Sequence, residues 1–478
     1  MRKAKIIATV GPSSFAENVL LEMVRSGADA FRLNFAHGTY EEKLNDIKII
    51  RSIEKKVKKY IPIIGDLQGP VIRLGVVDAF SVRKGESVKI VNKKVGNAAE
   101  KEVPIPDKDL FSMLDDDDFI LIESGRIIIH VDKVADNFAT GKVLLDGTIK
   151  SEKTVAIKGK DIPLPTLNEK DIKDAQFIIK SDFDYIGLSF VRDTRDVKEL
   201  RDFLTDHGAT DIKIISKIET KRAVDSITNI VKESDAILVA RGDLAIYYDL
   251  EQIPKIQDRI VKTSRALGRP VVIATQLLES MTANPMPTRA EVVDVSNAVW
   301  EDVDALMLAG ETAIGKYPVE CIIWLDKIIR EAEHIKRLQV EPKEETVYDN
   351  FAQGIVEMAK QIEAKIIAYT KGGNTGFRLA RYRPEKPFYL FTSKERIARQ
   401  LQLAWGTRAF VIDEHDPEEA FPKIIEHLKK QNELEPGDIV ILTAGMSIGA
   451  TDTIKIEKIR KQEIENLANK KLAKGVND

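Results

Sequence analysis

A lysine, a glycine and two carboxylates stand where apolar runs of this 478-residue sequence end. Lys217 and Glu219 are two residues apart at the end of one run, and Gly242 and Asp243 follow the next run. Because strand side chains alternate between faces, Lys217 and Glu219 share a face. Carboxylate oxygens are ligands that Mg²⁺ takes, with water and substrate completing its octahedron. The pattern predicts a divalent-metal site beside a fixed cation.

Other polar residues end neighbouring apolar runs. Arg32 and Asn34 share a face by the same alternation, and Ser189 and Thr275 contribute hydroxyls. Gly242 lets its backbone approach an anion, and its N–H group with that of Asp243 can hold a carboxylate. Together these residues describe a site for phosphoryl transfer, which depends on positioning and on charge neutralisation.

Structural explanations stay open from the residues alone. Lys217 and Glu219 can form an ion pair with no catalytic role, and Arg241 or Lys217 can hold the two carboxylates. His37 follows a run end closely enough to touch a ligand, whereas the other histidines are expected at the surface or in packing. No Ser/His/Asp arrangement, phosphate-binding P-loop or dinucleotide fingerprint is present.

The elements that must position these residues are eight short apolar runs separated by amphipathic stretches of helical length. One such stretch is Ile253–Leu267, and another begins with a capping box at Thr288. Eight β-α units predict a (β/α)₈ TIM barrel, with an open doubly wound sheet as the alternative. The predicted strands are Lys5–Val10, Ala30–Phe35, Pro62–Leu67, Asp184–Phe190, Lys213–Ile218, Ala236–Arg241, Pro270–Thr275 and Ala305–Gly310.

The barrel pattern is interrupted once and then followed by a second domain. Residues 71–160 have no long helical pattern and predict an inserted β-rich domain, a β-barrel lid, with strands at Ser87–Val91, Phe119–Glu123, Arg126–Val134 and Lys142–Leu145. The barrel is then formed by residues 1–70 and 161–340. After a charged linker at 341–345, residues 341–478 predict an open α/β regulatory domain, with a charged tail from Lys455 that is a surface helix or a frayed end. Its predicted strands are Lys365–Thr370, Pro387–Thr392, Ala409–Asp413 and Asp438–Thr443.

Composition excludes several classes of protein. The net charge of −3 carries no basic footprint for nucleic acid. No apolar stretch approaches the ~20 residues of a membrane span, and the first apolar run is too short for a signal peptide, so a cytoplasmic protein is expected. The single cysteine, Cys321, excludes an internal disulfide and a cysteine metal site, and it is expected to be a buried small hydrophobe.

Nearly the whole chain resembles the pyruvate kinase family. The resemblance is carried by the runs 6–12 (IIATVGP), 30–38 (AFRLNFAHG), 212–219 (IKIISKIE), 239–244 (VARGDL), 274–281 (ATQLLESM), 287–291 (PTRAE) and 307–313 (MLAGETA). It implies a homotetrameric enzyme of glycolysis that transfers the phosphoryl group of phosphoenolpyruvate to ADP, giving pyruvate and ATP, with Mg²⁺ (or Mn²⁺).

The resemblance also implies a role for each matching residue. Lys217 would neutralise the transferring phosphoryl group, Arg32 would clamp the phosphate with Ser189 lining its pocket, and Glu219 and Asp243 would bind the metal. The amides of Gly242 and Asp243, with Thr275, would hold the substrate carboxylate, and Thr275 lies near the carbon that is protonated. The nucleotide side would be Asn34, His37, Arg73 and Lys158.

Departures from the family pattern predict that potassium is not required. Of the four positions that surround a monovalent cation in other members, Asn34 and Asp66 keep oxygen ligands, whereas Ala36 and Leu67 do not. Four further positions depart from the usual residues: Gln68, Val71, Ser124 and Ala309. Ala309 replaces a serine near the proton-relay end of the site.

A glycine-rich turn in the last domain resembles the family's effector loop. It comprises Thr370, Lys371, Gly372, Gly373, Asn374 and Thr375, and its form is that of a phosphate nest, although an ordinary strand-to-helix turn is the alternative. Two other functions compete with this interpretation. The lid, Arg32 and Lys217 argue against a metal-dependent pyruvate-type aldolase or lyase. The intact Lys217, Glu219, Asp243 and Thr275 argue against a phosphometabolite sensor derived from an inactive kinase.

Overall fold

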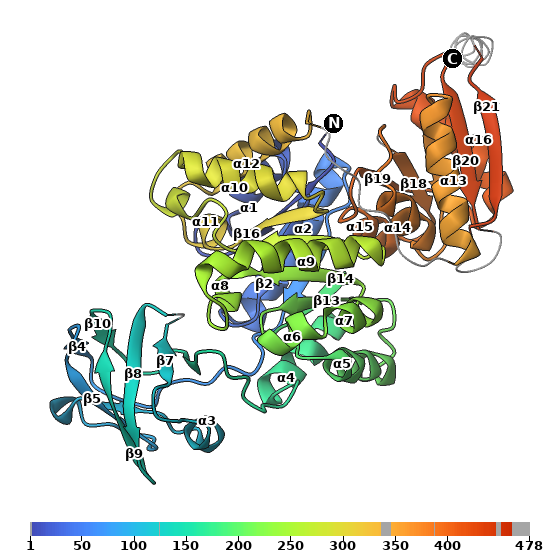
Figure 1. The fold of residues 1–478 in the computed structure, drawn as a ribbon. Coiled ribbons are helices and arrows are strands. Elements are labelled where there is room, and N and C mark those ends of the chain that lie inside the picture. Colours follow the sequence, from blue (N-terminus) through green and yellow to red (C-terminus); the bar gives the residue numbers. More distant parts are fainter. Residues whose placement is uncertain (1, 124, 336–345, 387, 446–450, 461–478) are drawn as a thin grey trace.

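The computed structural model describes residues 2–123, 125–335, 346–386, 388–445 and 451–460. Figure 1 shows three parts along the chain: a central barrel, a β-rich insertion beyond one of its ends, and an α/β domain against its other end. The expected linker at 341–345, Ser124, Pro387 and most of the charged tail lie outside the described residues. No helix of the described chain is long and apolar enough to cross a membrane.

The predicted barrel is confirmed. Eight parallel strands close in the order β1-β16-β15-β14-β13-β12-β3-β2. Their side chains are almost wholly buried, as expected for strands covered by helices on the outside and packed side chains within. The strands are β1 (Lys5–Thr9), β2 (Ala30–Asn34), β3 (Ile63–Asp66), β12 (Tyr185–Leu188), β13 (Lys213–Ile218), β14 (Ala236–Ala240), β15 (Val271–Ala274) and β16 (Ala305–Leu308).

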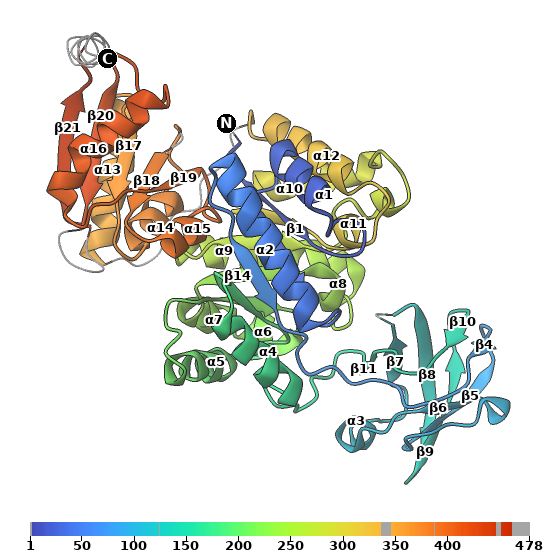
Figure 2. The ribbon, with the colours of Figure 1, turned by 180° about the vertical axis from the view of Figure 1, so that it is seen from behind.

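Helices cover the barrel on all sides (Figures 1 and 2). The predicted capping box at Thr288 is present, because its hydroxyl accepts from the Glu291 amide and the Glu291 carboxylate accepts from the Thr288 amide. Two short helices follow strands closely: α8 (Arg241–Leu244) begins directly after β14, and α11 (Gly310–Ala313) begins one residue after β16. The other helices of the barrel are α1 (Glu17–Ser26), α2 (Tyr40–Val57), α4 (Glu169–Lys180), α5 (Thr194–Asp206), α6 (Lys221–Asp225), α7 (Ile227–Glu233), α9 (Ile253–Ala266), α10 (Arg289–Trp300) and α12 (Pro318–Ala332).

The insertion after β3 is β-rich, as predicted. Its hydrogen bonds define a six-stranded sheet, β11-β7-β8-β9-β5-β6, and a two-stranded sheet, β10-β4, which share one apolar core. The strand predicted at Lys142–Leu145 is instead β9 (Phe138–Val143), because the chain has already left the sheet before the Asp146-Gly147 turn. The other elements are β4 (Phe80–Val82), β5 (Ser87–Val91), β6 (Glu102–Pro104), α3 (Lys108–Ser112), β7 (Phe119–Ile122), β8 (Ile127–Val134), β10 (Gly147–Ile149) and β11 (Val155–Ile157).

The carboxyl-terminal α/β domain is also confirmed, with one correction. Its sheet has the order β19-β18-β17-β20-β21, and its last strand runs antiparallel to β20. The expectation of a helix or frayed end from Lys455 is wrong for residues 455–458, which belong to that edge strand. The elements are α13 (Val347–Gln361), β17 (Lys365–Tyr369), α14 (Asn374–Arg381), β18 (Phe388–Thr392), α15 (Glu395–Leu401), β19 (Thr407–Val411), α16 (Pro417–Lys430), β20 (Ile439–Ala444) and β21 (Thr453–Lys458).

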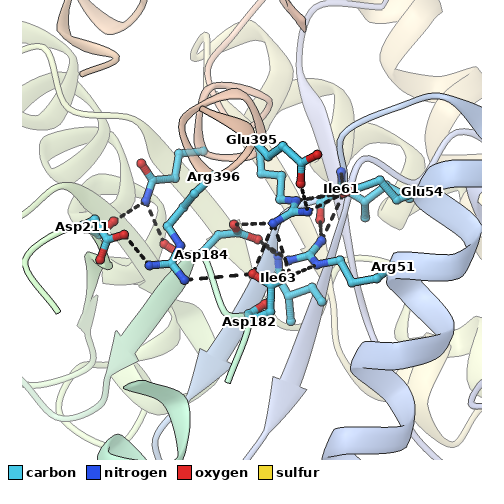
Figure 3. Close-up of polar contacts among 11 residues, drawn as sticks. Arg51, Glu54, Ile61, Ile63, Asp182, Asp184, Asp211, Glu395 and Arg396 are labelled. Carbon is cyan, nitrogen blue, oxygen red and sulfur yellow. Dashed lines mark hydrogen bonds and ion pairs between the residues drawn. The ribbon is translucent and has the colours of Figure 1, made fainter. Parts of the chain in front are cut away.

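Buried ion pairs join the barrel to this domain (Figure 3). Arg399 on α15 donates to both carboxylate oxygens of Glu54 on α2, through Nη2 at 2.8 Å and through Nε at 3.1 Å, and to Asp182 at 3.2 Å. Arg51 on α2 contacts the same Glu54 at 3.1 Å and Asp184 at 2.8 Å. Both partners of the Arg399–Glu54 pair are buried, so removing either one would leave the other as a buried charge without this partner.

Candidate active site

Two cations share one carboxylate at the carboxyl-terminal edge of the barrel. Arg32 near the end of β2 donates through Nε to Asp66 Oδ2 at 2.5 Å, and Lys217 Nζ on β13 lies 3.5 Å from Asp66 Oδ1. Burial alone would raise the pKa of Asp66, but Arg32 and Lys217 hold it below its usual value. The ionised Asp66 therefore keeps both cations aimed at the same place.

Lys217 is held by three groups in all. Its Nζ donates to Ser189 Oγ at 2.7 Å and lies 3.0 Å from Glu219 Oε1. Burial disfavours its charge, yet Asp66 and Glu219 more than compensate and raise the pKa of Lys217. The other carboxylate oxygen of Glu219 accepts from the Phe190 amide at 2.7 Å. Lys217 is thus a permanently charged and positioned group.

Asp243, in the short helix α8, lies close to Glu219, which follows β13. Burial and the negative charge of Glu219 raise the pKa of Asp243 to about 7. Mg²⁺ is usually bound through one or two carboxylates, and a bound cation would offset the repulsion between Glu219 and Asp243. The oxygen chemistry of Glu219 and Asp243 therefore fits Mg²⁺ or Mn²⁺, with substrate and water as the remaining ligands. No group of three or more acidic, histidine or cysteine ligands occurs in the described residues.

The turn after β15 is strained and held by Arg241. Thr275 and Gln276 have φ of 68° and 53°, a region that non-glycine residues rarely occupy. The Arg241 guanidinium donates to both of their carbonyl oxygens at 2.8 Å and to Asp294 at 2.8 and 2.9 Å. The idea that Arg241 holds the two carboxylates is therefore wrong. Thr275 Oγ1 accepts from the Gly242 amide at 2.9 Å, so the turn sits over the start of α8.

A pocket of about 260 Å³ opens between these strand ends and the base of the insertion. Val71, Ile72 and Asp161, which lie where the chain enters and leaves the insertion, line it together with Tyr247. Six of the predicted site residues line the same pocket: Arg32, Asn34, Arg73, Lys217, Glu219 and Asp243.

Five other predicted residues do not line this pocket. Ser189 contacts it only through Lys217, and Gly242 and Thr275 lie together beside it. His37 is exposed outside it, and Lys158 pairs with Asp249 at 2.7 Å. Within the pocket, Arg73 is engaged at 2.8 Å with the Glu152 carbonyl.

Sequence reasoning missed the counter-ion role of Asp66 and the pair formed by Asp161 and Tyr247. Tyr247 hydrogen-bonds Asp161, and burial followed by the charge of Asp161 raises the pKa of the phenol. Asp66 was visible as a charged residue that ends an apolar run. Asp161 could not be recognised from the sequence, because it lies in a loop between the insertion and the barrel, and its contact with Tyr247 is formed only in the folded chain.

Two of the four positions that the family resemblance associates with a monovalent cation have apolar side chains. Ala36 and Leu67 line the pocket. Asn34 Oδ1 accepts from the Ala36 amide at 3.0 Å, and Asp66 is bound to Arg32. The two remaining oxygen-bearing side chains therefore already have partners within the protein.

The glycine-rich turn of the last domain forms the start of α14. Gly373 has φ of 89°, which favours glycine, and its amide donates to Thr370 Oγ1 at 3.0 Å. Thr375 Oγ1 lies 3.0 Å from Thr451 Oγ1. Thr370 and Thr375 are thereby used inside the protein, whereas Asn374 is exposed.

A closed parallel barrel with two fixed cations and a pair of carboxylates at its carboxyl-terminal edge defines a barrel enzyme built for an anionic substrate. The family model "Pyruvate kinase, barrel domain" matches residues 1–322, and "Pyruvate kinase, alpha/beta domain" matches residues 349–457. The chain therefore belongs to the pyruvate kinase family.

Individual relatives agree with this membership. The chain is 34% identical to a pyruvate kinase of Aeropyrum pernix over 95% of this chain and 98% of the relative. It is 36% identical to one of Geobacillus stearothermophilus over 96% of this chain and 80% of the relative. The crystal structure of a pyruvate kinase from Pyrobaculum aerophilum has a TM-score of 0.88 at 32% identity, covering 96% of this chain and 99% of that one.

Proposed function

We infer that this protein is an active pyruvate kinase, which transfers the phosphoryl group of phosphoenolpyruvate to ADP and yields pyruvate and ATP. The observation that carries the inference is the group formed by Lys217, Arg32 and Asp66 beside the carboxylates Glu219 and Asp243. Phosphoryl transfer needs charge neutralisation at fixed positions, and these residues provide it from the ends of β2, β3 and β13 and from α8.

The roles follow from position and charge. Arg32 binds the phosphate of the substrate, and Lys217, held by Ser189 and Asp66, faces the phosphoryl group as its charge shifts. Glu219 and Asp243 would hold Mg²⁺ or Mn²⁺, which supplies further charge neutralisation when bound. Asn34 and Arg73 face the nucleotide from the side of the insertion, which acts as a lid. His37 and Lys158 join them only if the lid closes.

Thr275 and Gly242 position the carboxylate end of the substrate. In the free protein the Gly242 amide donates to Thr275 Oγ1. A substrate carboxylate that takes this amide, with that of Asp243, replaces the hydroxyl as acceptor. Thr275 Oγ1 is then released toward the substrate, where it orders the water that protonates the enolate carbon.

Glu219 provides the direct test of metal-dependent transfer. Purified wild-type protein is assayed with phosphoenolpyruvate, ADP and Mg²⁺ by coupling pyruvate to lactate dehydrogenase, with and without EDTA. We expect Glu219→Ala to abolish turnover while folding, and Glu199→Ala, an exposed glutamate on α5, to match the wild type. A fully active Glu219→Ala protein contradicts the assignment. Cleavage of substrate without ATP formation would favour a lyase instead.

Four further statements stay predictions. The enzyme works in the cytoplasm, as a homotetramer, without a need for potassium, and with a phosphorylated effector at the turn from Thr370 to Thr375. Light scattering during size-exclusion chromatography tests the tetramer. Calorimetry with sugar phosphates and nucleotides, repeated on Gly373→Glu, tests the turn: binding that this substitution leaves unchanged contradicts an effector there.

A further inference from the structure

A buried lysine near the active-site edge of the barrel has no partner among the described residues. Lys43, the fourth residue of α2, is only 8% exposed. Its side chain forms no hydrogen bond or ion pair there, although Asp46 and Glu42 are near it. Burial lowers the pKa of Lys43, and the charges of Asp46 and Glu42 offset this effect only in part. A buried ammonium group without a partner is unfavourable, and an anion bound to it would remove that cost.

The ammonium group of Lys43 lies at the start of α2, beside the loop that links this helix to β2. A Cβ atom added to Gly38, in that loop, would be only 3.2 Å from Lys43 Nζ. Helical side chains point back toward the amino terminus of their helix, so the lysine reaches the residue before the N-cap, Thr39. The loop begins after Asn34, at the barrel edge that carries the active site. Figure 2 shows one end of α2 on the side from which the insertion extends.

The first turn of α2 adds hydrogen-bond donors at the same place. Thr39 accepts from the amides of Glu42 and Lys43, and the Glu42 carboxylate accepts from the Thr39 amide at 2.7 Å. The amides of Tyr40 and Glu41 donate to no described group, and both residues are exposed. The helix has 18 residues, so the positive end of a long helix dipole lies there. Amides without acceptors beside an unpaired lysine are the features of an anion-binding site.

Two other cations are close to Lys43, but both are already engaged within the protein. Arg32 and Lys170 are near enough for their charges to lower the pKa of Lys43 further. Arg32 is bound to Asp66, and Lys170 pairs with Asp174 at 2.5 Å. Of these three cations, Lys43 is the one without a partner in the described part of the chain. It is therefore the one available for a ligand.

We propose that Lys43 and the first turn of α2 bind a phosphate group of ADP, which makes Lys43 a further substrate-binding residue. This inference rests on the proposed function and extends it. The phosphate of phosphoenolpyruvate is assigned to Arg32 and Lys217 in the pocket, and Lys43 does not line that pocket. Asn34 and His37, which are assigned to the nucleotide, precede Lys43 in the same loop. A nucleotide that contacts this loop brings its phosphate chain to the start of α2.

Calorimetry on the full chain tests this site without turnover. ADP and adenosine are titrated separately with Mg²⁺ at fixed ionic strength, in the absence of phosphoenolpyruvate. We expect Lys43→Met to bind ADP about tenfold or more weakly than the wild type, because it lacks one charged contact. Binding of adenosine, which has no phosphate, should be the same in both proteins. Lys43→Arg keeps the charge and should bind ADP more tightly than Lys43→Met. Lys48→Met, an exposed lysine on the same helix, is the matched control and should bind ADP as the wild type does.

Thermal unfolding without ligand separates a binding role from a structural one. Lys43→Met should unfold at the same temperature as the wild type or at a higher one, because it removes a buried charge without a partner. A lysine that only stabilises the fold would give a lower melting temperature and an unchanged affinity for ADP. That result would overturn the proposal.

Steady-state kinetics connect the site to the reaction. In Lys43→Met the KM for ADP should rise about tenfold, whereas the KM for phosphoenolpyruvate should change less than about twofold. The proposal is overturned if the wild type forms pyruvate and ATP but Lys43→Met binds ADP normally, or if only the KM for phosphoenolpyruvate rises. A wild-type protein that binds ADP through Lys43 but forms no pyruvate would contradict the proposed function and support this site.

Discussion

Replacing Lys217 with methionine removes one charge from the centre of the site while keeping the length and most of the volume of the side chain. Nζ of Lys217 is 2.7 Å from Ser189 Oγ, 3.0 Å from Glu219 Oε1 and 3.5 Å from Asp66 Oδ1. The substitution should therefore have two effects: it should reduce phosphoryl transfer, and it should destabilise the fold because the carboxylates of Glu219 and Asp66 lose a shared cation.

The catalytic loss is expected to be large and confined to one step. A single group aimed at developing charge contributes about 3–4 kcal/mol, so kcat should fall about a hundred- to a thousand-fold. Arg32 remains on Asp66 at 2.5 Å and still binds phosphate, so substrate affinity should change by less than about tenfold. Exchange of solvent protons into pyruvate should partly survive, because that step lies nearer Thr275.

Lys217→Met is expected to lower the free energy of unfolding by about 3 kcal/mol, which is the lower end of the range for a broken buried ion pair. Asp66 keeps Arg32, and Glu219 keeps the Phe190 amide at 2.7 Å, so neither carboxylate is left alone. Glu219 nevertheless loses the positive charge of Lys217, so its repulsion of the neighbouring Asp243 is no longer offset by this cation. Mg²⁺ should therefore raise the melting temperature of Lys217→Met more than that of the wild type.

Stopped-flow measurement of ATP formation, isotope exchange into pyruvate and thermal unfolding with and without Mg²⁺ provide the readouts. Lys221→Met, an exposed lysine at the start of α6, is the matched control and should behave as the wild type. Normal phosphoryl transfer by Lys217→Met would refute the role assigned to this lysine. A variant that loses substrate binding together with transfer would show that the lysine holds the ground state as strongly as the transition state.

Three other predictions concern ions, the domain interface and pH. The activity of dialysed enzyme in tetramethylammonium buffer with Mg²⁺ should increase little when KCl is added at constant ionic strength, because burying a cation with too few oxygen ligands is unfavourable. An increase in activity of about tenfold or more would refute this prediction. Arg399→Met should lower the free energy of unfolding by about 3 kcal/mol, because it breaks the buried pair with Glu54. Arg396→Met breaks a partly exposed pair with Asp211 (Figure 3) and should lower the free energy of unfolding by less than about 1 kcal/mol. Equal losses of stability in the two variants would contradict this prediction. Burial raises the pKa of Asp46 to about 6, above its unfolded value, so ionisation of this residue lowers the stability of the protein as pH rises from about 4 to 6. The melting temperature of Asp46→Asn should therefore increase relative to that of the wild type across this pH range. A difference in melting temperature that does not change with pH would contradict the prediction.

The barrel was predictable from the sequence because each of its strands is a buried apolar run between amphipathic helices. The insertion was less so. Four of its strands, such as β4 and β10, have only three residues, too few for an alternating pattern. The edge strand β21 was mistaken for a charged tail because half of its residues are charged, although Ile454 and Ile456 alternate with polar residues in it.

The chemistry of the site was predictable in type but not in geometry. Polar residues at strand ends revealed Lys217 and Glu219, because apolar residues are expected in a barrel core. The sharing of Asp66 by Arg32 and Lys217 depends on barrel closure, which places β2, β3 and β13 around one opening. The strained turn at Thr275 has no signature in sequence, because Arg241, which holds its carbonyl oxygen, lies 34 residues earlier in the chain.

The most direct test of the central claim is the stoichiometry of transfer in one reaction. Purified protein is incubated with phosphoenolpyruvate, ADP and Mg²⁺ in a potassium-free buffer, and pyruvate and ATP are measured together over time. The account predicts equal amounts of pyruvate and ATP, formed by the wild type and reduced about a hundred-fold or more by Lys217→Met. Absence of both products from the folded wild-type protein, or pyruvate without ATP, would contradict it.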